Sequence, residues 1–368
     1  MNMGVKLHEI ITRKEIDFKS LAGKVIAIDA PNIIMSLFNF TRKNPDGSYG
    51  ELILDRTQRP ISHLYNLLYR VNFLYSKNMF PIFCFDGKVS ELKRIITKDQ
   101  LKDFLFTKKW YGEAMQSGKR NLAREIASSK EYMWQNIIEE SQQLLGALGV
   151  PYIDSPASAE SQCAYLVKIG IAQFSNSQDF DSLLFGCPYL VQNLSKSLNR
   201  KVQGKWRYEK ITPLITNLQQ SLKLLNISLF QLVDLSLLIG TDYFPGIKGI
   251  GPKKGLKYIT QHKTIENVIS HQKNKYDFSS LTEKIINEVR RIFLLPEINE
   301  ADNQFYWNSP HIPKIKNLLC EEHHLNEERV SKNVEKLANS YRKCKDYFML
   351  NRKEPKSVQL TLDKINFN

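Results

Sequence analysis

The stretch "SHLYNLLYRVNFLYSKNMFPIFCFDG", residues 62–87, joins a helical pattern directly to a strand pattern. Its first part has apolar residues at helical spacing, and the run that follows from residue 79 is continuously apolar. An earlier run, "KVIAIDA" at 24–30, is a short β-branched strand pattern that ends in Asp29, just as the later one ends in Asp86. Strand, helix and strand in this order are typical of a parallel α/β sheet, whose ligands gather outside the carboxyl ends of the strands.

The same alternation continues along the chain. "VPYID" (150–154) restarts the strand pattern, and "SAESQCAYLVKIG" predicts a helix capped at Ser158. "IAQFSNS" is the next strand pattern and is followed by Asp179 and Asp181. An apolar helix at 229–240 places Asp242 just beyond its end. We therefore expect an α/β fold with a mostly parallel central sheet flanked by helices.

Composition predicts a globular protein with a polyanionic partner. The 368 residues are 42% apolar and 24% charged, and the formal net charge of +14 favours nucleic acid or an anionic membrane. The five cysteines are scattered without a C-x-x-C pair, the N-terminus has charges where a signal peptide needs its apolar core, and no run approaches 18 apolar residues. We expect a monomeric, intracellular, non-secreted protein without a membrane partner.

The segment from 87 to 130 is unusually basic, with 11 Lys and Arg residues against 5 Asp and Glu. Aromatic residues are interleaved with the charges: Phe104, Phe106, Trp110 and Tyr111. A solvated helical hairpin whose aromatics pack on the body is one interpretation. The other is a mobile helical gate that follows a nucleic-acid backbone.

A second basic element is "GIKGIGPKKGLKYITQHKTIENVI" (246–269), two helical patterns joined through a glycine-rich turn. Gly249 and Gly251 allow a backbone to approach closely, and a helix that begins near Pro252 carries Lys253 and Lys254 in its first turn. Exposed N–H groups at such a helix start can hold a phosphate. A helix-turn-helix without this function is the alternative.

The C-terminal third contains weaker signals. "CEEHHLNEE" (320–328) places His323 next to His324, and because adjacent residues point to different faces we interpret this stretch as a surface patch rather than a metal site. The composition turns basic and polar from 341 to 358, which predicts a linker or tail. We therefore expect one domain over 1–340 and a tail over 341–368.

Six carboxylates follow apolar elements in this otherwise basic chain: Asp29, Asp86, Glu160, Asp179, Asp181 and Asp242. Parallel topology would bring them together, and oxygen ligands of this kind hold hard cations beside a phosphate. We interpret Asp179 and Asp181 as alternating along an extended segment, with a cation offsetting their repulsion.

The motifs "VIAIDAPN", "FDGKVSELKR", "AESQCAYL", "SQDFDSLLFG", "GTDYFPGIKGIGPKKGL" and "FLLPEI" resemble, in order and spacing, those of the flap endonuclease family of structure-specific 5′ nucleases. The resemblance covers nearly the whole chain. It implies a two-metal phosphodiesterase, with flap endonuclease and 5′–3′ exonuclease activity, that cuts branched DNA during replication and repair. Two Mg²⁺ ions are the implied cofactors, with Mn²⁺ as the substitute, and the compartment is the cytoplasm of an archaeal-like cell or a eukaryotic nucleus.

The resemblance also implies roles for individual residues. Asp29, Asp86 and Glu160 would hold one metal, and Asp179, Asp181 and Asp242 the other. Lys93 would reach the scissile phosphate from a helical arch at about 87–131, with Lys93 and Asp181 as the catalytic pair. The element at about 240–270 resembles a helix–two-turn–helix that grips duplex DNA, often with a K⁺ ion, through Gly249, Gly251, Lys253 and Lys254. Arg42 and Arg70 match positions near the junction.

Three positions depart from the family pattern. Ser158 replaces the first glutamate of an acidic motif, Gln100 replaces an arch arginine, and Met35 replaces an aromatic residue that stacks on a base. The alternative function is therefore a paralogue that binds branched DNA without efficient cleavage. A phosphatase with Asp179 as its nucleophile is disfavoured, because its motif normally follows the first strand of a domain.

The C-terminal "QLTLDKINFN" resembles the family's sliding-clamp peptide. Gln359 and Leu362 are in register, whereas Ile365 stands where an aromatic residue usually enters the clamp's pocket. We expect a degenerate clamp-binding peptide in the tail.

Overall fold

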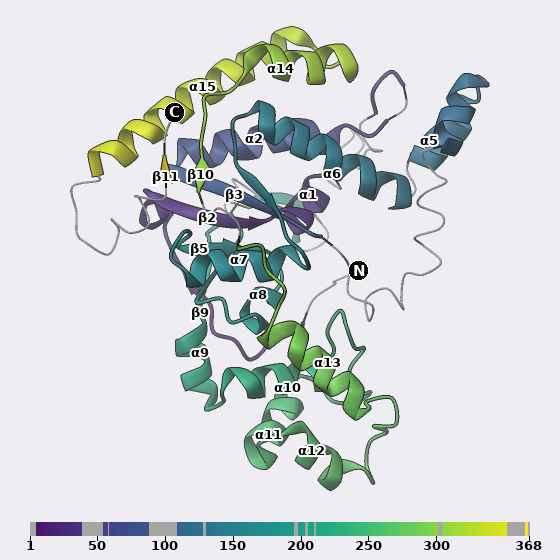
Figure 1. Cartoon of the computed structure of the whole chain (residues 1–368), viewed down its shortest axis with the longest axis vertical. Coiled ribbons are helices and arrows are strands. Elements are labelled where there is room, and N and C mark those ends of the chain that lie inside the picture. Colours follow the sequence, from purple (N-terminus) through teal and green to yellow (C-terminus); the bar gives the residue numbers. More distant parts are fainter. Residues whose placement is uncertain are drawn as a thin grey trace.

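A seven-stranded, mostly parallel sheet forms the centre of the protein, as predicted (Figure 1). The computed structural model describes residues 5–38, 54–57, 59–87, 109–127, 130–194, 198–202, 205–209, 211–300, 304–351 and 365–366. The strand order is β1-β9-β6-β5-β2-β3-β4. The parallel strands are β2 (Lys24–Asp29), β3 (Met79–Phe85), β4 (Tyr152–Asp154), β5 (Phe174–Asn176) and β6 (Tyr189–Gln192). Two antiparallel strands, β9 (Leu214–Asn217) and β1 (Lys14–Glu15), complete one edge.

Strand β2 lies between β5 and β3, and this placement determines where the acidic residues meet. Ile28 pairs with Phe83 of β3 and with Asn176 of β5, so all three strands end at about the same level. Asp29 ends β2, and Asp86 follows the last residue of β3. The connections that follow β3 and β5 therefore start beside Asp29.

Helices cover both faces of the sheet (Figure 1). On one side lie α2 (Ser62–Ser76), α6 (Lys130–Ala147) and α15 (Glu327–Leu350), and on the other lie α7 (Ala159–Lys168) and α8 (Asp181–Leu184). Helix α1 (Ala30–Phe38) continues directly from β2. The strands β2 and β3 are almost entirely buried between these layers, as expected for a parallel sheet.

A helical unit lies at the lower end of Figure 1. It follows α9 (Leu218–Leu225) and contains α10 (Leu229–Ile239), α11 (Pro252–His262), α12 (Ile265–Gln272) and α13 (Glu283–Leu294). The two helices expected over 246–269 are α11 and α12, which ends at Gln272, but they are joined through Lys263 and Thr264; the glycine-rich turn instead joins α10 to α11. No single helix in the described ranges has the length and hydropathy to cross a bilayer, and only the bent pair α9 and α10 meets that test together.

The predicted boundary at 340 is wrong, because α15 extends to Leu350. The segment has basic residues on its exposed face and an apolar face that is buried. The buried residues recur at helical spacing: Tyr341, Cys344 and Phe348. The Tyr341 hydroxyl donates to the Trp307 carbonyl (2.5 Å), and Trp307 Nε1 donates to the Pro81 carbonyl (2.8 Å). The end of α15 is therefore part of the core.

The remaining described elements are short. They are η1 (Phe18–Leu21), a helix at 109–116, α5 (Arg120–Ala127), the hairpin of β7 (Leu198–Val202) and β8 (Lys205–Glu209), β10 (Phe305–Tyr306), α14 (Ile312–Lys316), the π-helical turn η2 (Asn317–Glu322) and β11 (Ile365–Asn366), which pairs with β10. Most of the predicted arch, with Lys93 and Gln100, lies outside the described residues. Arg42, Gln359 and Leu362 also lie outside them.

Candidate active site

Asp29 is the buried centre of the candidate site. It ends β2, is 1% exposed, and accepts hydrogen bonds from the Asn32 backbone N–H (3.2 Å) and from Ser177 Oγ (2.8 Å). The Asn32 side chain then donates to Asp179 Oδ2 (2.7 Å) and accepts from the Gln178 N–H (3.0 Å). Asn32 thus links the end of β2 to the loop after β5. The sequence analysis assigned no role to Asn32, although it lies in the "VIAIDAPN" motif.

A close backbone approach places Asp86 beside the start of α7. The Gly87 N–H donates to the Ala157 carbonyl (2.8 Å), and a Cβ at Gly87 would lie 1.7 Å from the Ser155 carbonyl oxygen. Only glycine fits there. The contact lets Asp86 Oδ1 accept from the N–H of Ala159 (2.7 Å), the first residue of α7, which also carries Glu160 in its first turn.

The expectation that Asp179 and Asp181 alternate along an extended segment is wrong. Strand β5 ends at Asn176, residues 178–180 form a bend, and Asp181 is the first residue of α8. The two carboxylates accordingly have different partners. Asp179 accepts from Asn32, whereas Asp181 Oδ1 accepts from the backbone N–H of Val5 (3.1 Å). Asp242 lies in the turn after α10, where the Thr241 hydroxyl accepts from the N–H groups of Tyr243 (3.0 Å) and Phe244 (3.2 Å).

The electrostatics divide the acidic residues into two groups. Burial raises the pKa of Asp29 well above its ordinary value, and the charges of Glu160 and then Asp86 raise it further, against the hydrogen bonds from Ser177 and Asn32. Burial, with the charge of Asp242, raises the pKa of Asp179 to about 6. The charges of Glu160 and Asp86 therefore reach Asp29, and the charge of Asp242 reaches Asp179.

These residues fit a hard divalent cation by chemistry. Every donor is a carboxylate oxygen, and neither the hydrogen-bond partners of Asp29 nor the neighbours that perturb it carry positive charge. Within the described ranges, no three Asp, Glu, His or Cys side chains converge closely enough to hold one ion directly between them. Mg²⁺ tolerates this arrangement, because it usually keeps several water ligands and binds few carboxylates directly.

Ser158 is the N-cap of α7. Its backbone is extended, its Oγ accepts from the Ser161 N–H (3.2 Å), and the residue is 8% exposed. The cap predicted from the sequence is confirmed. Met35 lies in α1 and is partly exposed.

The glycine-rich turn presents a helix N-terminus to solvent. Gly249 has φ +88°, and Gly251 caps α11 without a side-chain hydrogen bond, so the first N–H groups of α11 keep their capacity for an anion. Lys253 and Lys254 are exposed in this turn, and Lys254 Nζ donates to the Gly249 carbonyl (3.1 Å). The element can therefore bind phosphate.

A buried ion pair braces this helical unit, and the sequence analysis missed it. Asp234, in the middle of α10, accepts from Arg290 Nε (2.7 Å) and Nη2 (2.8 Å) of α13 and from the Ile265 N–H of α12 (3.1 Å). Burial raises the pKa of Asp234, whereas the hydrogen bonds with Asp234 and Glu266 raise the pKa of Arg290. The bidentate geometry indicates an ionised pair. A charged residue within an apolar helix was the available signal.

Arg70 packs inward, not outward. Its guanidinium donates to the Leu194 carbonyl, and burial lowers its pKa to about 10. Its predicted role near the DNA junction would use the guanidinium N–H groups that do not donate to Leu194.

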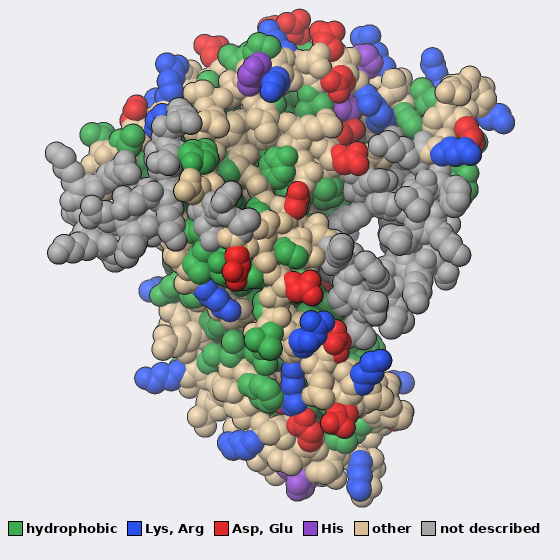
Figure 2. Space-filling view, in the orientation of Figure 1, with side chains coloured by type: hydrophobic (Ala, Val, Ile, Leu, Met, Phe, Trp, Pro, Cys, Tyr) green, Lys and Arg blue, Asp and Glu red, His purple; other side chains and the backbone are tan. Residues whose placement is uncertain are grey.

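In Figure 2, several acidic side chains lie near the middle of the face, between the upper helices and the lower helical unit.

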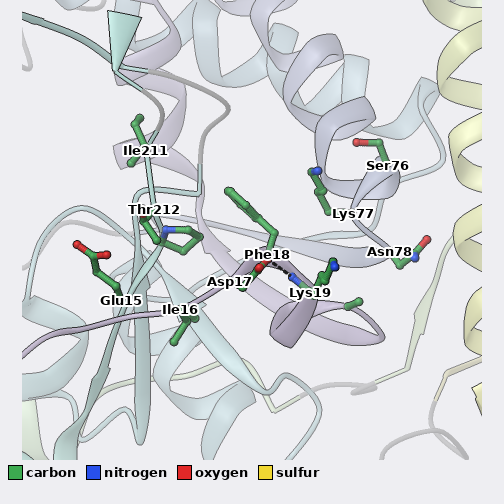
Figure 3. Close-up of a pocket in the computed structure, with 12 residues that line it drawn as sticks. Glu15, Ile16, Asp17, Phe18, Lys19, Ser76, Lys77, Asn78, Ile211 and Thr212 are labelled. Atoms are coloured by element: carbon green, nitrogen blue, oxygen red, sulfur yellow. Dashed lines mark hydrogen bonds between the residues drawn. The ribbon is translucent and has the colours of Figure 1, made fainter.

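A surface groove of about 720 Å³ lies elsewhere (Figure 3). Glu15, Asp17, Lys19 and Lys77 contribute charges of both signs to its lining. Asn78, which also lines it, immediately precedes β3, so the groove lies at the opposite end of the strands from Asp29 and Asp86. The groove is not part of the acidic site.

Two family models match the chain. The XPG N-terminal domain matches residues 3–102, and the XPG I-region matches residues 149–242. These two ranges contain all six carboxylates of the candidate site.

The chain is similar over nearly its whole length to archaeal proteins called flap endonuclease 1. Identity is 34% over 335 residues with the protein of Archaeoglobus fulgidus, covering 91% of this chain and 96% of that one. It is 36% over 345 residues with the protein of Staphylothermus marinus, covering 92% and 96%.

Solved structures share the fold. Flap endonuclease-1 from Methanococcus jannaschii has a TM-score of 0.69 at 26% identity and covers 92% of this chain and 99% of its own. The catalytic core of Rad2 in complex with a DNA substrate has a TM-score of 0.65 at 23% identity, covering 91% and 100%, which indicates the fold alone.

Proposed function

This chain belongs to the flap endonuclease family, and we propose that its acidic residues at the carboxyl ends of the strands hydrolyse phosphodiesters at the 5′ flaps of branched DNA with two Mg²⁺ ions. Structure-specific 5′ flap endonuclease function follows from the family, whose nucleases depend on metal ions. One observation carries the assignment of the site. Acidic residues from separate segments lie at the carboxyl ends of β2, β3 and β5, and the charges of Glu160 and Asp86 contribute to the raised pKa of Asp29.

In this proposal Asp29, Asp86 and Glu160 hold one ion, and Asp179, Asp181 and Asp242 the other. The ions would supply an activated water and neutralise the leaving oxygen. The protein positions the carboxylates. Asn32 keeps Asp29 and Asp179 at a constant separation, Gly87 allows Asp86 to reach the start of α7, and the Val5 N–H orients Asp181. Lys93 would contact the scissile phosphate, and the start of α11 would hold the duplex backbone, with K⁺ as a further ion there.

A labelled double-flap substrate tests the function. We expect cleavage in Mg²⁺ or Mn²⁺, none in EDTA, and none by Asp181→Ala. If a flap is bound but not cut by the wild type under any of these metals, the alternative paralogue that binds without cleaving is correct. Ser158 and Gln100 are the residues that favour this alternative, because each removes a charged group of the family pattern.

The departure at Ser158 gives a graded prediction. Ser158→Asp keeps the helix cap, because Asp is a preferred N-cap residue, and adds a carboxylate beside Glu160. We expect a lower Mg²⁺ concentration for half-maximal cleavage and a faster rate, about tenfold for each 1.4 kcal/mol of recovered transition-state stabilisation. Ser158→Glu should act in the same direction but cost about 1 kcal/mol of stability through the lost cap.

Ser158→Ala is the matched control, because it loses the cap without adding charge. We expect it to be less stable but unchanged in its Mg²⁺ requirement. If Ser158→Asp cuts no faster and requires no less Mg²⁺ than the wild type, Ser158 has only its capping role.

The phosphate-binding turn predicts a change in salt dependence. Replacing Lys253 and Lys254 together by Ala should weaken binding to every duplex-containing substrate alike, and should reduce the slope of log affinity against log salt by about 2 for B-DNA. Fluorescence anisotropy between about 50 and 200 mM salt, a range over which counterion release changes the affinity strongly, measures this slope. An effect confined to one base sequence would contradict a backbone contact. Lys273→Ala, another lysine of the same unit, is the control.

The tail remains a candidate for a further partner. We propose that residues 359–365 bind a sliding clamp weakly. We also propose that the nuclease is a monomer and that it has a single domain, which includes the arch at about 87–131. The described backbone of β11 includes Ile365 and pairs with β10. Weak clamp binding would therefore require this pairing to open.

A further inference from the structure

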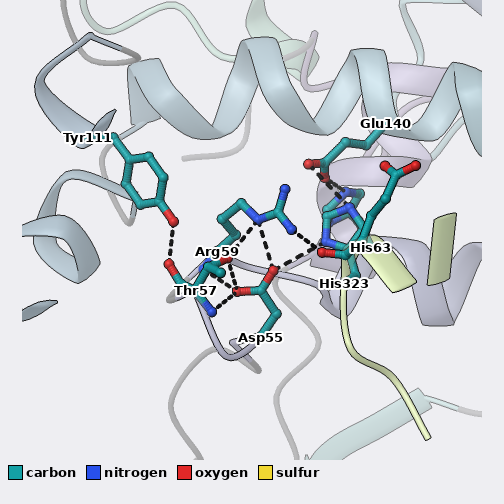
Figure 4. Close-up of polar contacts among 8 residues, drawn as sticks. Asp55, Thr57, Arg59, His63, Tyr111, Glu140 and His323 are labelled. Carbon is teal, nitrogen blue, oxygen red and sulfur yellow. Dashed lines mark hydrogen bonds and ion pairs between the residues drawn. The ribbon is translucent and has the colours of Figure 1, made fainter. Parts of the chain in front are cut away.

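A cluster of charged and titratable side chains lies outside the acidic site (Figure 4). It joins four segments through Asp55 of the 54–60 segment, His63 of α2, Glu140 of α6 and His323, which follows η2. The interpretation of residues 320–328 as a surface patch is wrong for His323, which is 1% exposed, although its neighbour His324 is exposed. The tertiary fold covers one face of the pair and leaves the other in solvent.

Both ring nitrogens of His323 face carboxylates. Nδ1 lies 3.4 Å from Asp55 Oδ2, and Nε2 lies 3.6 Å from Glu140 Oε1, which are ion-pair rather than hydrogen-bond distances. A neutral imidazole has one N–H and one lone pair, so it would turn the lone pair toward one of these anions. A doubly protonated ring presents N–H to both.

The groups around His323 are consistent with one proton charge on the two histidines, carried by His323 and not by His63. Burial lowers the pKa of His63, against its hydrogen bond to Glu140 Oε2 (2.9 Å), so a neutral His63 can donate there. Arg59 Nε donates to Asp55 Oδ2 (2.8 Å), and its Nη2 donates to the Glu322 carbonyl. With His63 neutral, Arg59 together with a doubly protonated His323 would balance the two carboxylates.

The cluster also organises the chain around residue 55. Asp55 Oδ1 accepts from Thr57 N (2.8 Å), Thr57 Oγ1 (2.7 Å) and Arg59 N (2.9 Å). The Tyr111 hydroxyl, from the helix at 109–116, donates to the Thr57 carbonyl. Residue 54 follows segment 39–53, which contains Arg42, and residue 109 follows segment 88–108, which contains Lys93.

We propose that His323, held as a cation between Asp55 and Glu140, is a positioning residue that couples the two chain segments leading to the predicted DNA contacts, and that DNA engagement weakens when it loses its proton. The DNA part of this proposal rests on the proposed function, whereas the state of His323 does not. Among the described side chains of this cluster, Arg59 and His323 are the cationic or protonatable groups that face Asp55.

The test compares two adjacent histidines. In ¹⁵N-histidine NMR at pH 7, the His323 signal, assigned by its loss in His323→Asn, should be that of an imidazolium. His323→Asn should lower the Tm by roughly 5 °C at pH 6, and by less than half of that at pH 9, because a bound proton stabilises the fold only while it stays bound. His324→Asn is the matched control, since Asn tolerates the left-handed backbone (φ +55°) of this exposed residue. It should change neither quantity.

Cleavage kinetics provide the functional readout. At pH 6.5, His323→Asn should raise KM for a double flap by roughly threefold to tenfold with kcat within about twofold, and the difference from wild type should narrow at higher pH. A neutral His323 at pH 7, or a Tm deficit independent of pH, overturns the proposal. If no flap is cleaved by the wild type, the proposed function fails, while the NMR and Tm results still decide the state of His323.

Discussion

Asp29→Asn is expected to reduce flap cleavage by at least about 10³-fold and, in EDTA at neutral pH, to increase the free energy of unfolding. The first effect follows because a metal ion contributes several kcal/mol of transition-state stabilisation, and each 1.36 kcal/mol is a factor of ten in rate. The second follows because burial, Glu160 and Asp86 all disfavour the charged form of Asp29. Asn is nearly isosteric: its Oδ1 can still accept from the Asn32 N–H, and its amide nitrogen, in the place of Oδ2, can donate to Ser177 Oγ. A residue with only a structural role would not show loss of activity together with gain of stability.

The sign of the pH dependence follows from the direction of the pKa shifts. A carboxyl group whose folded-state pKa is raised stabilises the metal-free fold below its unfolded pKa, and that stability is lost as the pH rises through the folded pKa. For Asp179, whose pKa is raised to about 6, the window is about pH 4 to 6. Because Asp179 is partly exposed, we expect Asp179→Asn to remove only roughly 1–2 kcal/mol of this dependence. Denaturant unfolding in EDTA at several pH values measures both variants.

Asp154→Asn is the matched control for these variants. Asp154 ends the neighbouring strand β4, but it is exposed and accepts from Gln142 Nε2 (2.7 Å). We expect cleavage within about twofold of wild type and little change in stability. Equal loss of activity in Asp154→Asn and Asp29→Asn would contradict the assignment of the site, as would destabilisation of Asp29→Asn in EDTA at neutral pH.

Asp234→Ala is expected to destabilise the protein by roughly 3–5 kcal/mol and to weaken duplex binding. It removes the buried one of the two carboxylates on the Arg290 guanidinium, whose side chain is only 14% exposed, and leaves the half-exposed Glu266; removing one partner of a buried pair costs about this much. It also removes the acceptor of the Ile265 N–H at the start of α12. The packing of α10, α12 and α13 that places the basic turn of α11 therefore loses its shared polar contact.

Two further variants test whether the stability lost in Asp234→Ala comes from the unpaired charge of Arg290 or from the mutation in general. Glu266→Ala removes the other carboxylate that binds Arg290. Because the Glu266 side chain is half exposed, this variant should cost at most about 1 kcal/mol of stability. The double variant Asp234→Leu with Arg290→Met removes both charges and should recover most of the stability lost in Asp234→Ala. If the double variant is as unstable as Asp234→Ala, the loss does not come from an uncompensated charge. Chemical denaturation, with anisotropy of a labelled duplex, distinguishes these outcomes.

Features that depend only on neighbouring residues could be predicted from the amino-acid sequence. The β-branched run ending in Asp29 and the apolar run before Asp86 are strands β2 and β3, and the helical spacing over 62–76 is α2. The cap at Ser158 and the helix start at Pro252 were also predicted. These features could be predicted because side-chain periodicity, caps and glycine-rich turns act within a few residues of the chain.

Contacts between residues far apart in the chain could be identified only in the folded protein. The bond from Asn32 to Asp179 spans 147 positions, that from Val5 to Asp181 spans 176, and the burial of His323 depends on α6 and on the segment at Asp55. Beyond residue 340, the apolar face of α15 is buried because Tyr341 packs on Tyr75 and Phe348 packs on Phe80. None of these contacts has a local signature, because the free energy that favours them comes from burial and charge compensation between segments that adjoin only after the chain has folded.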